Sequence, residues 1–304
     1  MTSLLEAIDA RHAIRAYTDE PVAPDVLAAL QAEIDACNAE SGLHIQMAAG
    51  LDDAFLGLKT HYGRFKGVHN AIALVGAVGS GSANDDGETD ANGAGGATRS
   101  GDAATTLQSF KDAEGTPVSQ AAAALQERVG YYGERLVLRA VQLGLDTSWA
   151  VLDGAEAVSA DDAWWTLDAD AGESVVWVIA FGHGARPGGR RRTKPMEELA
   201  SIEGGSSAPD GIAGEPRASG DAGDTDADAA ATPLADVPDW FRAGMEAAMA
   251  APTSLSQQPF HFTLHPSDGT VTAEALDGLF AHVGLGCAKY HFEIGAAPHR
   301  VEWR

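Results

Sequence analysis

Two groups of cationic side chains stand out in a chain that is otherwise strongly acidic. Arg11 and Arg15 are four residues apart, so on a helix or its C-terminal turn they project from the same side. Such a pair suits a phosphate, because each guanidinium group donates charge-assisted, bidentate hydrogen bonds. The second group is the basic run at residues 190–194, which includes Arg192 and Lys194. Both groups predict an anion site; surface salt bridges to the many carboxylates are the alternative.

Two further segments combine turn residues with polar side chains. Residues 251–260 read APTSLSQQPF, in which Thr253, Ser254 and Ser256 can each donate and accept hydrogen bonds. Residues 144–149 read GLDTSW after a long amphipathic stretch. The motifs G-x-S-x-G, H-E-x-x-H and Walker A do not occur, and the histidines are dispersed without metal-ligand spacing. No catalytic side chain and no metal site are therefore predicted.

These segments resemble motifs of the FMN-dependent nitroreductase family. RHAIRAY at residues 11–17 is similar to R-x-S-x-R-x-F/Y, and APTSLSQQPF is similar to A-P-S-x-x-N-x-Q-P-W. KPMEEL at residues 194–199 resembles R-K-P-L-E-E, and GLDTSW resembles G-L-G-T-C-W. The chain departs from the family at Ala13, where relatives have Ser or Thr, and at Ser256, where they have Asn.

The resemblance implies an FMN site made from several parts of the chain. Arg11, Arg15, Arg192 and Lys194 are expected to hold the phosphate. His12 and Ala13 match positions beside the cofactor in relatives, and Leu152 and Gly154 match the loop whose backbone faces the polar edge of the isoalloxazine. In relatives, the segment that corresponds to Pro252, Thr253, Ser254 and Ser256 reaches across the dimer interface to the partner's flavin.

The resemblance also implies an activity. The expected enzyme takes electrons from NAD(P)H through FMN and passes them to a small, electron-poor acceptor such as a nitroaromatic, a quinone or an activated alkene. Because Ala13 lacks a hydroxyl group and Ser256 has a shorter reach than Asn, a flavin-binding storage or sensor protein without turnover is the alternative. An enzyme that consumes its flavin as substrate is a third possibility.

The order of the motifs predicts one chain that imitates the family homodimer. Residues 1–203 form the expected first nitroreductase-like half, with an acidic, flexible loop at about residues 79–114. Residues 204–235 form an acidic, flexible linker, and residues 236–304 form the second half. Because both insertions are rich in Gly, Ser and Asp, they have little apolar surface to bury. A monomer or weak dimer is expected.

The elements that must position these motifs follow from apolar periodicity. Helices are predicted at residues 4–10, after Pro24, at 118–143 and at 239–250. A further helical stretch is predicted at 274–297, with Gly284 and Gly286 as candidate interruptions. Strands are predicted at residues 43–47, 71–78 and 173–181, with a hairpin from 260–264 and 270–272. Long helices with few strands favour an α+β fold in which helices wrap a mixed sheet.

Composition limits the partners. The 304-residue chain carries 44 acidic and 20 basic residues, a formal charge of −24. Such a charge repels phosphate backbones and anionic lipids, which argues against nucleic-acid and membrane partners. It fits a halophilic protein kept soluble at high salt; the alternative is that the charge lies mainly in flexible loops. Cys37 and Cys287 are expected to be buried, and a cytoplasmic location is expected because no signal peptide or membrane span is visible.

Overall fold

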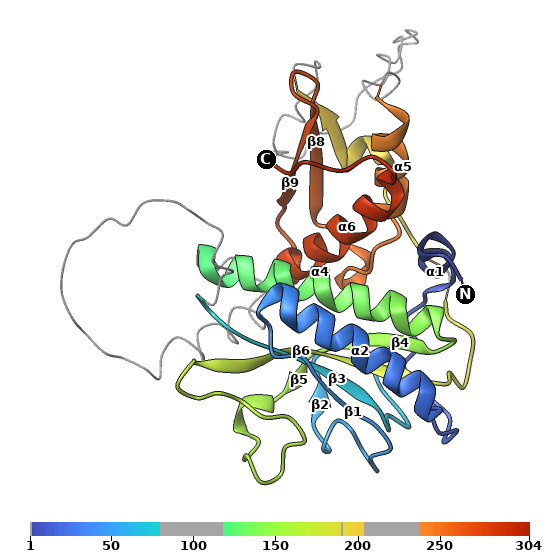
Figure 1. Cartoon of the computed structure of the whole chain (residues 1–304), viewed down its shortest axis with the longest axis vertical. Coiled ribbons are helices and arrows are strands. Elements are labelled where there is room, and N and C mark those ends of the chain that lie inside the picture. The colour runs from blue at the N-terminus through green and yellow to red at the C-terminus, as the bar shows by residue number, and fades with distance from the viewer. Residues whose placement is uncertain (1, 80–117, 190, 204–236) are drawn as a thin grey trace, which may run out of the picture.

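The computed structural model describes residues 2–79, 118–189, 191–203 and 237–304 (Figure 1). The predicted acidic loop, apart from Gly79, and the predicted linker lie outside the described residues, as does Arg190 of the basic run.

An antiparallel four-stranded sheet forms the base of the N-terminal part (Figure 1). Its central strand pair is buried along almost its whole length, as expected of strands covered on both faces, and confirms the strands predicted at residues 71–78 and 173–181. A bulge between Leu74 and Val75 shifts the register of this pair. The strand order is β1 (Gln46–Ala48), β3 (Ala71–Ala77), β6 (Glu173–Gly182) and β4 (Asp146–Ala150).

The two faces of this sheet have different covers. Helices α2 (Pro24–Ser41) and α4 (Gln120–Gln142) cover one face, where Ile72 and Leu74 join a core with Ile34 and Leu136. Loops cover the other face with Phe55 and Trp165. The short strands β2 (Lys59–Thr60) and β5 (Leu152–Asp153) pair with each other there.

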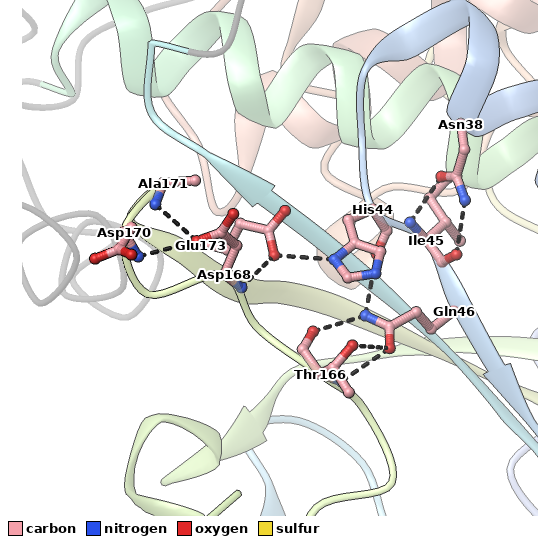
Figure 2. A network of polar contacts seen from close by, with 9 residues as sticks. All are labelled: Asn38, His44, Ile45, Gln46, Thr166, Asp168, Asp170, Ala171 and Glu173. Carbon is pink, nitrogen blue, oxygen red and sulfur yellow. Dashed lines mark hydrogen bonds and ion pairs between the residues drawn. The ribbon is translucent and has the colours of Figure 1, made fainter.

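A polar network fixes the loop that leads into β6 (Figure 2). Glu173 at the start of β6 accepts a hydrogen bond from the Asp168 backbone at 2.7 Å, and its carboxylate lies 2.9 Å from Nδ1 of His44. Gln46 of β1 bonds the backbone of Thr166 in both directions, at 2.8 Å each. These contacts hold the loop against the edge of the sheet.

A second, three-stranded sheet belongs to the C-terminal part. Strand β7 (Ala200–Ile202) runs parallel to β8 (Phe260–His265), and β8 pairs antiparallel with β9 (Thr270–Ala275). The predicted hairpin is confirmed, with Gly269 at φ 78° in its turn. Strand β7 lies at the end of the predicted first half, residues 1–203. Its hydrogen bonds to β8 make it part of the C-terminal sheet.

The last predicted helix begins later than expected. Residues 274 and 275 still belong to β9, and α6 runs over Ala281–Ala296 after a left-handed residue, Phe280, at φ 56°. The prediction that Gly284 and Gly286 interrupt the helix is wrong. They remain in a continuous helix that packs against α4 and against α5 (Asp239–Ala248) (Figure 1).

Glycines allow α4 and α6 to cross at very short range. A Cβ at Gly130 of α4 would lie 2.1 Å from the carbonyl oxygen of Val283, and a Cβ at Gly286 would lie 2.0 Å from that of Glu127. Neither position has room for a side chain. The crossing joins the N-terminal part of the chain to the C-terminal part.

The fold is α+β, as predicted. The mixed strand pairing lies in the C-terminal sheet, whereas the larger sheet is antiparallel throughout. Both cysteines are buried and free. Burial raises the pKa of the Cys37 thiol to about 12. In the part of the chain that the structure describes, no helix has both the length and the apolar character that crossing a bilayer requires.

Candidate functional site

A cavity of about 370 Å³ lies where the two parts of the chain meet. Its size falls within the usual range for small-molecule sites. One side is built from residues 11–15 and from β4, and the other from residues 249–258 and the start of α6. Nine of the twelve residues predicted for the site line it: Arg11, His12, Ala13, Arg15, Arg192, Pro252, Thr253, Ser254 and Ser256.

The N-terminal wall is an extended segment. Helix α1 (Leu4–Ala10) ends at Arg11, and Ala13 forms an isolated parallel bridge with Thr147 of β4. The helix or last turn expected to carry Arg11 and Arg15 is therefore wrong, because the segment that holds them is extended. In extended chain alternate residues share a side, and four residues span about 13 Å at about 3.3 Å per residue. The two arginines thus face different parts of the cavity.

Arg11 lies at the inner end and is only 6% exposed. Its Nη2 donates to the carbonyl oxygen of Ala250 at 3.3 Å, and its Nε lies 3.5 Å from Oε1 of Glu134. That Nε is buried yet has no hydrogen bond of normal geometry with the described residues. Arg11 is thus held by one carboxylate and one carbonyl while it lines the cavity.

Glu134 of α4 is fully buried, and three residues of the described chain outside its helix make hydrogen bonds or an ion pair with it. Trp149 Nε1 donates to its Oε2 at 3.0 Å, and Nε2 of His291 on α6 lies 3.0 Å from its Oε1. The third neighbour is Arg11. Sequence reasoning missed this group, because a lone Glu and a lone His on separate helices carry no spacing signal.

Arg15 occupies the other end of the segment. Its Cδ and Nε pass so close to Gly63 that a Cβ there would lie 2.8 Å from both. The neighbouring Tyr62 lines the cavity, and the backbone of Lys66 donates to the Arg15 carbonyl oxygen at 2.9 Å. Arg15 therefore lies at the aromatic end of the site.

The basic run contributes Arg191 as well as the predicted Arg192. Arg191 is half-buried, and its Nη2 donates to the backbone carbonyl of Asp9. Partial burial lowers the pKa of Arg191, and the nearby positive charge of Arg11 lowers it further. Two cations therefore share the inner end of the cavity. Lys194, which the sequence favoured, does not line the wall.

Buried Gln258 joins the basic run to the C-terminal wall. Its Oε1 accepts from the Lys194 backbone at 2.6 Å, and its Nε2 donates to Met249 O at 3.0 Å and to Thr193 Oγ1 at 3.1 Å. Its own backbone donates to Thr253 Oγ1 at 3.0 Å. One amide side chain thus fixes the spacing of two segments about sixty-five residues apart in sequence.

The C-terminal wall holds an unusual backbone. Leu255, Ser256 and Gln258 all have left-handed φ angles, between 47° and 56°, although none is glycine. Such conformations are disfavoured for residues with a Cβ and persist where the surroundings enforce them. Leu255 is 67% exposed on this segment. The backbone of this wall therefore adopts its shape at a cost in conformational free energy.

Aromatic rings close another side of the cavity. Trp177 and Phe280 meet edge to face with their centroids 4.8 Å apart, and Tyr62 lies 6.0 Å from Phe280. Trp149 packs on Trp177 at 5.9 Å. Because these rings come from separate elements, no sequence spacing pointed to them. They provide an apolar surface suited to a planar ligand.

Besides Lys194, two further residues predicted for the site do not line the cavity. Leu152 is buried in β5, and Gly154, at φ 87°, precedes the short 3-10 helix η1 (Ala155–Ala157). Ala150 and Val151, just before them, line the cavity instead. Leu152 and Gly154 thus lie one and three residues beyond Val151, the last residue of this stretch that lines the cavity.

The charge of the wall is opposite to that of the chain. Four arginines line the cavity, and no Asp or Glu does among the described residues, although the chain carries a formal charge of −24. Because like charges brought together repel, the arrangement favours an anionic ligand at the inner end.

A family model and several solved structures match this chain. A family model described as "Putative TM nitroreductase" matches residues 3–87, 116–213 and 229–296. The comparison with curated proteins found no match. A solved "putative nitroreductase" from Thermotoga maritima is 15% identical, with a TM-score of 0.47, over 97% of this chain and 83% of that one.

Two shorter solved proteins match about two thirds of the chain. A nitroreductase family protein from Streptococcus pneumoniae is 18% identical over 65% of this chain and 98% of its own, with a TM-score of 0.42. A "putative nitroreductase" from Desulfovibrio desulfuricans, solved in complex with FMN, is 22% identical over 66% and 96%, with a TM-score of 0.36. Since the family model spans most of the chain in three segments that include both walls of the cavity, the chain belongs to the nitroreductase family that this model describes.

Proposed function

We propose that the protein is an FMN-dependent oxidoreductase that passes electrons from NAD(P)H to a small electron-poor acceptor, such as a nitroaromatic or a quinone. The observation that carries this proposal is the composition of one cavity. It combines four arginines, no carboxylate among the described residues, a wall of aromatic rings and most of the motif residues. A planar, anionic cofactor fits that combination.

The inner end of the cavity fits a phosphate. Arg11 has a buried Nε without a proper hydrogen bond, and Arg191 is half-buried beside it. A phosphate there would compensate two cations that now repel each other, through charge-assisted hydrogen bonds. We assign Arg11 and Arg191 to the phosphate, and Arg192 to its exposed rim.

The remaining residues fit the rest of a flavin. Arg15 and the rings of Tyr62, Trp177 and Phe280 lie at the aromatic end, where they would bind and orient an isoalloxazine. The hydroxyl groups of the C-terminal wall, on Thr253, Ser254 and Ser256, can donate to or accept from polar atoms of the cofactor.

The protein's part in the reaction is binding, orientation and exclusion of water. When bound, FMN supplies the two-electron chemistry between NAD(P)H and the acceptor. The aromatic wall keeps the reacting surface apolar, and the arginines keep the cofactor in place. The mechanism requires no acid or base from the protein, so none is assigned.

We further propose that the chain is a pseudo-dimer that acts as a monomer or weak dimer. Both walls of the cavity come from one chain, although they lie more than two hundred residues apart. In the family resemblance, the second wall is the part contributed by a partner subunit. Here the crossing of α4 and α6 brings the two parts together.

Three measurements test the proposed function. Titration of the purified protein with FMN should show saturable binding, and the bound flavin should give its characteristic absorption bands. Steady-state oxidation of NADH and NADPH, with menadione and with a nitroaromatic, should then require the bound flavin. Binding without turnover would favour a storage or sensor protein, loss of intact FMN after reduction would indicate consumption of the flavin, and no binding would contradict the proposal.

A further inference from the structure

A buried chain of polar groups lies behind the inner end of the cavity. The imidazole of His291 on α6 is fully buried, with Nδ1 3.1 Å from the carbonyl oxygen of Ala247 and Nε2 3.0 Å from Glu134 Oε1. A carbonyl oxygen only accepts, so Nδ1 carries a hydrogen. Nε2 lies at hydrogen-bond distance from Oε1, so the ring bridges the Ala247 carbonyl and the Glu134 carboxylate.

The carboxylate of Glu134 has little freedom to move. Trp149 donates to Oε2, while His291 and Arg11 approach Oε1. These neighbours come from β4, from α6 and from the segment after α1. A buried carboxylate with this many polar neighbours is a rigid anchor, because rotation would break contacts that no water can replace.

Arg11 is the one neighbour of Glu134 that carries charge into the cavity wall. Its Nε faces Glu134 at 3.5 Å, and its Nη2 donates to the Ala250 carbonyl oxygen at 3.3 Å. A guanidinium group with 6% exposure needs a countercharge to remain buried. Without one, hydration would draw the side chain out toward solvent.

We propose that Glu134, braced by His291, is a positioning residue that aims Arg11 at the phosphate of the cofactor. The inference rests on the proposed function and adds to it a residue pair that touches no ligand. Glu134 belongs to α4 and His291 to α6, so the anchor is complete only when the two parts of the chain are packed together. Binding of the phosphate therefore depends on the α4–α6 crossing.

The test compares FMN with riboflavin, which lacks the phosphate. Glu134→Gln keeps the shape of the side chain and removes its charge. We expect the affinity for FMN to fall about tenfold or more, as for one misdirected charge-assisted hydrogen bond. The affinity for riboflavin should stay within about twofold, since the aromatic end is unchanged. A general loss of structure would weaken both ligands alike.

The matched control is Glu293→Gln on α6. Glu293 also accepts two side-chain hydrogen bonds, from Tyr131 at 2.6 Å and from Trp303 at 2.7 Å, but it does not line the cavity or contact Arg11. This variant should leave the ratio of FMN to riboflavin affinity unchanged. Urea unfolding of both variants separates stability from binding.

A second variant decides the case if Glu134→Gln does not fold. His291→Asn can still place an amide donor near Ala247 and removes the brace on Glu134, so it should lower FMN affinity selectively and to a smaller extent. Equal losses for both flavins, or none, would overturn the positioning role while leaving the proposed function in place. Failure of the unmodified protein to bind FMN more tightly than riboflavin would overturn both.

Discussion

At the scale of single residues, the arginines of the cavity divide into two groups. Arg11 and Arg191 share the inner end, where burial and mutual repulsion act on the same two guanidinium groups. Arg15 lies at the aromatic end beside Gly63 and Tyr62. In the proposed function, the first group binds the phosphate and Arg15 binds beside the ring, so the two groups should respond differently to a ligand without a phosphate.

Replacing Arg191 by Ala should weaken FMN binding selectively. Loss of one charge-assisted contact costs about 1.5–3 kcal/mol, roughly a tenfold to hundredfold rise in Kd. Isothermal titration with FMN and with riboflavin measures the effect, and riboflavin affinity should hardly change. Arg186→Ala is the control, because Arg186 is exposed on the same stretch of chain and does not line the cavity. Equal behaviour of the two variants would remove Arg191 from the phosphate site.

Replacing Arg15 by Ala should weaken FMN and riboflavin to a similar degree. The reason is its place at the aromatic end, about 13 Å along the extended segment from Arg11. The same titrations test this, with circular dichroism to check that the fold survives. A loss confined to FMN would instead return Arg15 to the phosphate and restore the paired-arginine interpretation.

At the scale of elements, the site depends on how closely α4 and α6 cross. Changing Gly to Ala inside a helix ordinarily stabilises it by about 0.5–1 kcal/mol. At Gly286 the added Cβ would lie 2.0 Å from Glu127 O and 2.7 Å from Tyr131 N, both backbone atoms that cannot move alone.

Gly286→Ala should therefore lower the free energy of unfolding by about 1–3 kcal/mol, the usual cost of overpacking. Chemical denaturation measures it, and Gly130→Ala, which faces the same crossing from α4, should act in the same direction. Stabilisation by either change would show that the two helices do not approach this closely.

Element prediction from the sequence succeeded where periodicity was strong and packing was simple. The amphipathic pattern of α4 and the apolar runs of β3 and β6 carried enough signal to place the bounds of each element within two residues. The start of α6 was misplaced because Glu274 and Ala275 suit either a helix or a strand, and pairing with β8 decides for the strand. Pairing with a neighbouring strand cannot be predicted from the local residue pattern.

Prediction of the site had a similar limit. Motif spacing pointed to both walls of the cavity, because those residues are contiguous in sequence. The aromatic wall and the Glu134–His291 pair were missed, since each residue comes from a different element and only the fold brings them together. The helical geometry assumed for Arg11 and Arg15 failed because the bridge between Ala13 and Thr147 extends that segment along β4.

At the scale of the whole molecule, the formal charge of −24 should make stability depend on salt. Self-repulsion is screened over about 3 Å at 1 M salt and about 10 Å at 0.1 M. Thermal melts across a potassium chloride series should therefore show a midpoint that rises with concentration. A flat profile would mean that the carboxylates are too widely separated in the folded state to repel each other.

In the proposed pseudo-dimer, one chain builds a complete flavin site. The walls at residues 11–15 and 249–258 meet within a single chain, and the α4–α6 crossing holds them together. Sedimentation velocity of the FMN-loaded protein, recorded at both protein and flavin wavelengths, tests this most directly. We expect the flavin to sediment with the single-chain species, at one FMN per chain. Flavin found only on a dimer, and lost when the dimer dissociates, would contradict it.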